Sequence, residues 1–277
     1  MSEVAENIKK AYMVPGLPHL VFRNESWSSL QTAYQEVGKT IQSLNPDIIV
    51  VYSAQWISVL GHSFQADPNP KGHHVDENWY SLSKQATFDF DFKVDVDLAQ
   101  KAASIADRMG LATKLVNYKG FPIDTGSLTV QRFLNPDNKI PMMIVSSNIY
   151  CDRDASRQLG QAVREALVES GKSAVLVNCS SLSHRFFTQD INPAEDKISQ
   201  PEDDAWNQRI LTLIKAGKNQ EAFDLGPEYA QAANPEMQFK GFYWMMGALD
   251  MPAAPGNVTA YGPIWGTGNA VIEYSLN

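Results

Sequence analysis

Apolar and polar positions follow two different periodicities along the chain, one typical of strands and one typical of helices. An unbroken apolar run at 48–51, entered through a Pro-Asp pair, predicts a strand covered on both faces, as in parallel or mixed sheets. Similar runs predict buried strands at 140–146 and 174–178, and strict alternation at 88–92 predicts a half-exposed strand. Weaker patterns predict further strands at 57–64, 113–118 and 269–274.

Apolar residues at helical spacing predict helices between these strands. They are expected at 27–44, 95–109, 124–134, 155–170, 201–216, 219–233 and 241–249. Ser26 or Ser28 is suited to cap the first helix, and residues 65–81 read as a loop. Because strands and helices alternate without a linker, the sequence predicts an α/β fold. We expect a single-domain sandwich over residues 1–277, with a central mixed or parallel sheet flanked by helices and a polar segment at 1–10.

Charge and cysteine content narrow the class of protein. A net charge of −8 argues against nucleic acid as the main partner, because phosphate binding requires a basic surface. Two isolated cysteines, Cys151 and Cys179, have no metal-ligand spacing and suit a reducing cytoplasm. The polar first ten residues do not resemble a signal peptide, and no apolar run approaches the ~20 residues of a membrane helix. The expectation is a soluble cytoplasmic protein without a membrane partner.

The polar residues that could carry chemistry gather at predicted strand ends and loops. They are His19, Gln55, His62, Thr125, His184 and Glu236. His184 is the most promising, because it follows a buried strand through a Ser-rich turn, and ligands of α/β sheets bind outside the carboxyl ends of strands. The others have structural explanations: His19 can cap a turn, His62 can pack within a strand, and Glu236 suits a first helical turn. His73 and His74 lie in a polar loop and are expected to be solvated.

Several motifs in a fixed order resemble one enzyme family from residue 15 to the end of the chain. They are Leu-Pro-His-Leu-Val at 17–21, Pro-Asp at 46–47, the segment 56–62, Asp-Thr-Gly at 124–126, Leu-Ser-His at 182–184, Trp-Met at 244–245 and Ile-Trp-Gly-Thr-Gly-Asn-Ala-Val at 264–271. The chain resembles the class III extradiol ring-cleavage dioxygenases, the family of protocatechuate 4,5-dioxygenase catalytic subunits. It is similar in particular to the subunits of 2-aminophenol 1,6-dioxygenase.

The resemblance implies an iron site that this chain has lost in part. Active members hold Fe(II) with two histidines and one glutamate, which leaves positions open for the ring and O₂. Here the histidine positions carry Gly16 and Gln55, whereas the carboxylate falls at Glu236 and the acid/base histidine at His184. A further pocket position carries Thr125. Together with His19 and His62, these residues would form a vestigial pocket, in which His184 is a vestigial acid/base and no metal is held.

The resemblance therefore implies a non-catalytic α subunit of a hetero-oligomeric, Fe(II)-dependent 2-aminophenol 1,6-dioxygenase. Ring cleavage of the small aromatic substrate with O₂ would occur in a homologous, iron-bearing β subunit, in an (αβ)₂ assembly. This chain would then be inactive alone and bind no cofactor. Two alternatives stay open. One is an active mononuclear enzyme with shifted ligands His19, His62 and Glu236; the other is a metal-free module that binds a ring or a nucleotide near His184 and regulates its partner.

Overall fold

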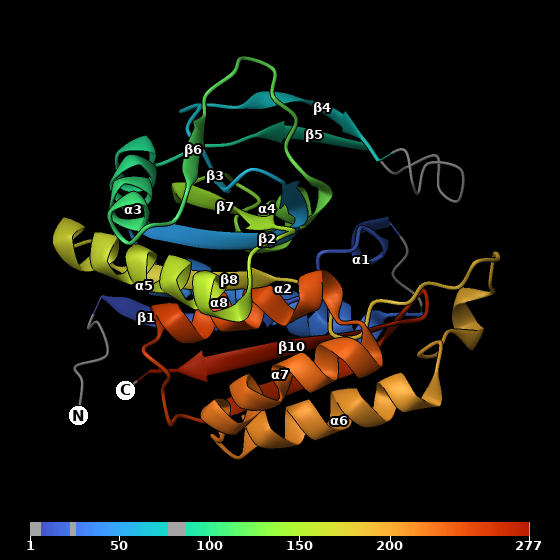
Figure 1. Ribbon diagram of the computed structural model, residues 1–277. Coiled ribbons are helices and arrows are strands. Elements are labelled where there is room, and N and C mark those ends of the chain that lie inside the picture. Colours follow the sequence, from blue (N-terminus) through green and yellow to red (C-terminus); the bar gives the residue numbers. More distant parts are fainter. Residues whose placement is uncertain (1–6, 23–25, 77–86, 277) are drawn as a thin grey trace.

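The computed structural model, which describes residues 7–22, 26–76 and 87–276, is built around an eight-stranded mixed sheet (Figure 1). Its strands lie in the order β6-β3-β7-β2-β8-β1-β10-β9. Their bounds are β1 (Ile8–Val14), β2 (Ile48–Ser58), β3 (His62–Gln65), β6 (Thr113–Val116), β7 (Met142–Asn148), β8 (Ala174–Cys179), β9 (Gly256–Ile264) and β10 (Thr267–Ser275). The central strands β7, β2, β8 and β1 are parallel, and β10 and β9 add an antiparallel pair. The predicted mixed sheet is thereby confirmed.

Helices cover both faces of this sheet (Figure 1). One face carries α1 (His19–Phe22), α2 (Ser28–Leu44) and α4 (Thr125–Leu134). The other carries α3 (Val96–Arg108), α5 (Arg153–Ser170), α6 (Pro201–Lys215), α7 (Asn219–Ala233) and α8 (Lys240–Ala248). Ile48 and Val50 pack in the core beneath α3, α5, α6, α7 and α8. Ile49 and Val51 pack in the core beneath α1, α2 and α4, so each face of the apolar run is covered by a layer of helices. No helix in the described ranges is long and apolar enough to span a membrane.

The helices α5 and α8 approach each other so closely that glycine is needed at their contact. A Cβ on Gly160 would lie 1.9 Å from the carbonyl oxygen of Trp244, and one on Gly247 would lie 2.0 Å from that of Arg157. The two backbones therefore touch, which holds α8 and the segment before it against the sheet.

Some predicted elements need correction. The expected strand at 57–64 is divided between the end of β2 and the start of β3, because the chain bends at 59–61, where Gly61 adopts a φ of +87°. Part of the expected loop at 65–81 forms β4 (Lys71–Val75), which pairs with β5 (Thr87–Asp91) in a separate two-stranded sheet; residues 77–81 lie outside the described ranges. The cap of α2 is Trp27, without a side-chain hydrogen bond, rather than Ser26 or Ser28. The strand β9 was not predicted from sequence.

Candidate active-site pocket

A bulge in β2 creates the central feature of the site. Ser53 pairs with Ser146 of β7, yet Ile57 pairs with Ser147, so residues 54–56 have no pairing partner on β7. Bulges of this kind re-aim side chains beside functional sites. Here the bulge turns Gln55 into a cavity of about 610 Å³ at the carboxyl ends of the parallel strands. The cavity is lined by Leu17, Ala54, Gln55, Ile57, His74, Asp76, Asp124, Thr125, His184, Phe186, Glu236 and Met237.

Gly16, the second residue after β1, lies directly behind Gln55. A Cβ at Gly16 would be 2.9 Å from Nε2 of Gln55 and 2.9 Å from Sγ of Cys179. The space into which a longer side chain would project from position 16 is therefore filled by an amide and a thiol. Burial raises the pKa of the Cys179 thiol, and the negative charges of Asp124 and Glu236 raise it further, so Cys179 is a neutral thiol at pH 7.

Glu236 and His184 are brought together by two chain segments that run side by side. Ser183 and Pro235 form an isolated antiparallel bridge, and the amide of Glu236 donates to the carbonyl of Leu182 at 3.0 Å. Oε2 of Glu236 accepts a 2.6 Å hydrogen bond from the amide of Ser181. Oε1 of Glu236 lies 3.7 Å from Nε2 of His184, which is too long for a direct hydrogen bond. The pair is thus held within reach of a common ligand in the cavity.

The residues after Glu236 adopt an unusual backbone. Met237, Gln238 and Phe239 all lie in the left-handed region, with φ of 47°, 58° and 67°. Three successive non-glycine residues in this region store strain, which surrounding contacts must hold and which is characteristic of functional sites. The sequence predicts an ordinary helix start here; the structure replaces it with a left-handed turn that directs Met237 into the cavity.

A hydrogen-bonded chain closes the side of the cavity near β4. The hydroxyl of Thr125 donates to Oδ2 of Asp76 at 2.5 Å, and Nε2 of His74 lies 3.1 Å from the same hydroxyl oxygen. Because the hydroxyl has one proton, which goes to Asp76, His74 donates to Thr125 from Nε2. His74 was expected to be solvated and Asp76 was not singled out. Their spacing of two residues, which puts both on one face of a strand, was the available signal.

A second polar link connects β2 to the start of α4. Oδ1 of Asp124 accepts from the hydroxyl of Ser53 at 2.6 Å and from the amide of Ser127 at 3.0 Å, and Oδ2 accepts from the Ser127 hydroxyl at 2.6 Å. Asp124 is therefore the N-cap of α4, as the turn-to-helix pattern at 124–127 predicts. The cap fixes Thr125, the next residue, at the cavity wall.

Two of the predicted pocket residues lie elsewhere. His19 packs between Trp27 and Trp265, with ring centroids 5.2 and 5.4 Å away. His62 is buried in β3, where desolvation and the positive charge of Lys240 lower its pKa to about 4. Neither lines the cavity that holds Glu236, and within the described ranges no group of three His, Cys, Asp or Glu side chains is arranged to hold a metal ion.

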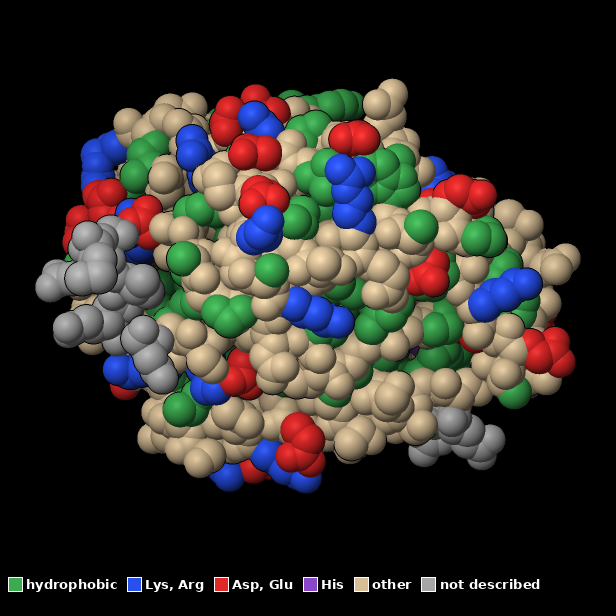
Figure 2. All heavy atoms as spheres, turned by 90° about the horizontal axis from the view of Figure 1, so that it is seen from below, with side chains coloured by type: hydrophobic (Ala, Val, Ile, Leu, Met, Phe, Trp, Pro, Cys, Tyr) green, Lys and Arg blue, Asp and Glu red, His purple; other side chains and the backbone are tan. Residues whose placement is uncertain are grey.

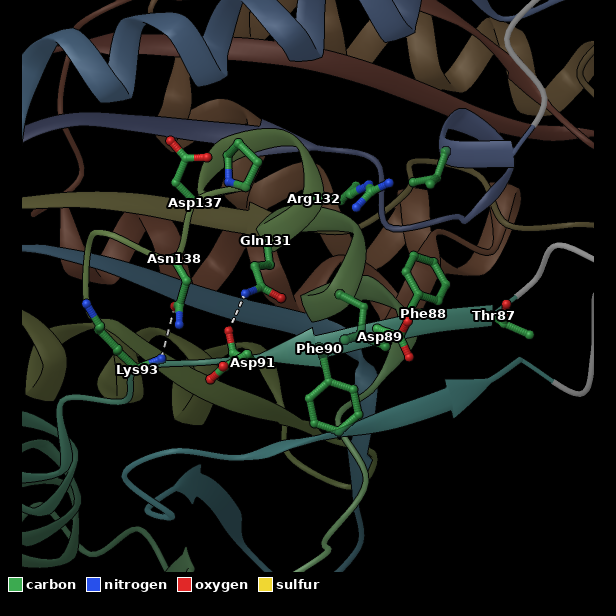
Figure 3. A pocket seen from close by; sticks show the side chains of 13 residues that line it. Thr87, Phe88, Asp89, Phe90, Asp91, Lys93, Gln131, Arg132, Asp137 and Asn138 are labelled. Atoms are coloured by element: carbon green, nitrogen blue, oxygen red, sulfur yellow. Dashed lines mark hydrogen bonds between the residues drawn. The ribbon is translucent and has the colours of Figure 1, made fainter.

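Another hollow, of about 590 Å³, lies between β5 and the carboxyl-terminal part of α4 (Figure 3). Gln131 donates to the carbonyl of Asp91 at 2.6 Å, and the amide of Lys93 donates to Asn138 at 3.1 Å, so these polar groups brace the fold across the hollow. None of the candidate catalytic or metal-ligating residues lines it. The cavity at the strand ends is therefore the candidate functional site.

The face that carries α6 mixes both signs of charge. Figure 2 shows acidic and basic side chains interspersed over the described part of this face, among hydrophobic and other uncharged groups. Such a surface presents no continuous basic field of the kind that binds a phosphate backbone.

The fold defines an α/β protein with a candidate ligand site outside the carboxyl ends of its parallel strands, and comparison with known families places it further. Residues 16–271 match the family described as the catalytic LigB subunit of aromatic ring-opening dioxygenase. The chain belongs to this family, which confirms the class III extradiol dioxygenase resemblance.

Individual relatives show which members of the family this chain is similar to. The chain is 34% identical over 272 residues to the 2-aminophenol 1,6-dioxygenase alpha subunit of a Pseudomonas species, covering 97% of this chain and 99% of the relative. It is 32% identical over 290 residues to the beta subunit, covering 97% and 94%. To 3,4-dihydroxyphenylacetate 2,3-dioxygenase of Escherichia coli it is 22% identical over 234 residues, covering 83% of each.

Among solved structures, an uncharacterized protein of Escherichia coli K12 shares the fold. It has a TM-score of 0.67 and 17% identity, and the match covers 96% of this chain and 99% of that one. This likeness supports the α/β architecture alone.

The hydroxyl of Thr125 supports a buried carboxylate, and removing it is expected to destabilise the protein. Thr125→Val leaves Asp76 and His74 without their shared partner, which should lower the free energy of unfolding by about 1–3 kcal/mol. Thr129→Val is the matched control: Thr129 is fully buried in the same helix, and its hydroxyl has no hydrogen bond within the described structure. The control removes a buried hydroxyl that has no partner, so the free energy of unfolding in urea should stay the same or rise. Equal effects of the two substitutions would contradict the assignment.

The lowered pKa of His62 predicts part of the acid sensitivity of the fold. Between pH 6.5 and about 4 the unfolded chain holds a proton on this histidine and the folded chain does not. Stability therefore falls as the pH falls, by about 1.4 kcal/mol per pH unit in this window. His62→Gln should flatten the dependence of unfolding free energy on pH below 6.5 and leave its slope above pH 7 unchanged. Parallel curves over pH 4–6.5 would show that His62 is not the group responsible.

Proposed function

We propose that this chain is the non-catalytic α subunit of a 2-aminophenol-type 1,6-dioxygenase, whose iron and chemistry reside in a homologous β subunit. The observation that carries the proposal is the packing of Gly16, Gln55 and Cys179. Two of its curated relatives are the alpha and beta subunits of one such enzyme, which supports a partner of the same fold. A dimer of αβ pairs is the assembly we propose.

The donor atoms at the proposed metal position do not fit Fe(II). The family resemblance calls for two imidazoles and one carboxylate. Position 16 offers no donor, and Gln55 offers only a neutral amide. The nearby Cys179 stays a neutral thiol because its pKa is raised, and it occupies the space that a side chain at position 16 would need. One carboxylate, Glu236, does not supply the charge and geometry of a facial triad.

The retained polar residues have a structural task that does not require iron. Glu236 accepts from the amide of Ser181 and so ties the loop after β8 to the left-handed turn before α8. Thr125 ties α4 to the segment after β4 through Asp76. These links keep the cavity open and the strand ends in place, which is what a subunit that shapes its partner needs.

The cavity also favours a second candidate function, the binding of a small ring without metal. Three of its lining residues are acidic, two are histidines, and the described lining contains no lysine or arginine. A ring that bears a carboxylate would be repelled, whereas a neutral ring or an amine would be tolerated. Heat of binding on titration of the isolated chain with 2-aminophenol would favour this function over a purely structural pocket.

The iron content of the isolated chain, purified anaerobically, tests the proposal. The expected content is about zero iron per chain, together with no ring cleavage of 2-aminophenol unless the homologous histidine-bearing chain is added. That homologous chain, prepared in the same way, is the positive control and should contain about one iron.

Near-stoichiometric iron in this chain would contradict the proposal. Glu236→Ala then locates the metal, because it removes the proposed carboxylate ligand. Iron lost in this variant would mean that the cavity holds the metal despite Gly16 and Gln55. Ring cleavage by the chain in the absence of any partner would equally overturn the assignment.

A further inference from the structure

A group of large apolar side chains is exposed at the carboxyl ends of β2 and β7. Ile57, Val59 and Leu60 belong to β2 and the turn after it, and they are 55%, 53% and 90% exposed. Ile149 and Tyr150 follow β7 and are 43% and 77% exposed. We call these five residues the β2–β7 patch. Exposed apolar side chains that occur singly need no explanation, but a contiguous group marks an interaction site.

The two segments of the β2–β7 patch are adjacent in space. The amide of Ile149 donates to the carbonyl of Ser58 at 2.9 Å. Asn148 opposes Ser58 across the parallel ladder, and its side-chain amide donates to the carbonyl of Gly61 at 2.7 Å. The exposed residues on either side of these contacts therefore form one surface.

The β2–β7 patch is rigid, because buried polar groups hold it from beneath. The hydroxyl of Ser58 donates to the carbonyl of Gly61 at 2.8 Å. The ammonium of Lys240, a residue only 2% exposed, donates to the carbonyls of Asn148 and Ile149 at 3.0 and 2.7 Å. A surface ordered before binding loses little conformational entropy when a partner covers it.

We infer that the β2–β7 patch is the docking site for the homologous iron-bearing subunit, an inference that rests on the proposed function. The patch is continuous with the cavity, because Ile57 is exposed on the surface and also lines the cavity wall. A partner bound here lies at the rim of the cavity, where it can contact or cover the space beside Gln55. Tyr150 supplies an aromatic anchor of the kind found at the centres of stable interfaces, and Leu60 adds exposed apolar surface beside it.

The relatives of this chain favour a homologous chain over a second copy as the occupant of the β2–β7 patch. All five residues of the patch are uncharged, so the surface that covers it is itself apolar. The relatives of this chain include both subunits of one enzyme, and the beta subunit matches 97% of its length. The occupant is therefore a chain of this fold that meets the β2–β7 patch with an apolar surface of its own.

The test measures assembly of this chain with the homologous chain of the same organism that carries histidines at the positions of Gly16 and Gln55. Val59→Lys places a charge in the β2–β7 patch. Val168→Lys is the matched control, because it changes the same residue type at a similar exposure of 56%. Val168 lies in the last turn of α5, about 22 Å along the helix from Arg153, which begins α5 three residues after Tyr150 of the patch. Thermal unfolding of each isolated variant confirms that both remain folded.

Val59→Lys is expected to weaken the Kd of the pair by about tenfold or more, and Val168→Lys by less than about twofold. If the unsubstituted chains associate and both variants leave this association equally intact, the docking site is overturned while the proposed function stands. Failure of the unsubstituted chains to associate would overturn the proposed function and the docking site with it. If this chain self-associates, only Val59→Lys abolishes the self-association, and binding to the homologous chain is unaffected, the β2–β7 patch belongs to a second copy and the inference is overturned.

Discussion

The need to cover β2 on both faces determines the rest of this structure. Ile48 and Val50 pack against the helices of one layer and Ile49 and Val51 against those of the other, so the strand must lie inside a sheet with helices on both sides. Parallel neighbours then follow from the crossover connections. Their carboxyl ends meet at one edge, and the cavity, the bulge and the β2–β7 patch all lie there.

The space beside Gly16 is filled rather than left empty. Gly16 has no side chain, and Gln55 and Cys179 occupy the space next to it. Around them, the bonds from Ser181 to Glu236 and from Thr125 to Asp76 hold the cavity walls together. The stored strain of the left-handed turn at 237–239 shows that the frame is maintained at an energetic cost. This combination is what we expect of a chain that supports a catalytic relative.

Periodicity was sufficient to predict the elements whose burial follows from their own sequence. The helices α2, α3, α5, α6, α7 and α8 and the strands β7 and β8 lie close to their expected ranges, and β2 begins where the apolar run predicts but continues to Ser58. The strand β4 was missed because its polar sequence shows no alternation, and β9 because it contains Pro263, which is tolerated at a sheet edge.

The site was predictable only in part. Gln55, Thr125, His184 and Glu236 do line one cavity, with Gly16 behind Gln55, whereas His19 and His62 are packed elsewhere. The bulge at 54–56 depends on the register of β7, and the left-handed turn at 237–239 depends on tertiary contacts, so local sequence could not reveal either. The role of Cys179 likewise appears only once β8 is placed beside Gly16.

The most direct test is anomalous scattering at the iron edge from crystals of this chain assembled with its homologous partner. We expect one iron for each pair of chains, located in the partner, and no anomalous peak beside Glu236 and Gln55 of this chain. An iron peak within the cavity of this chain would contradict the assignment of the iron to the partner.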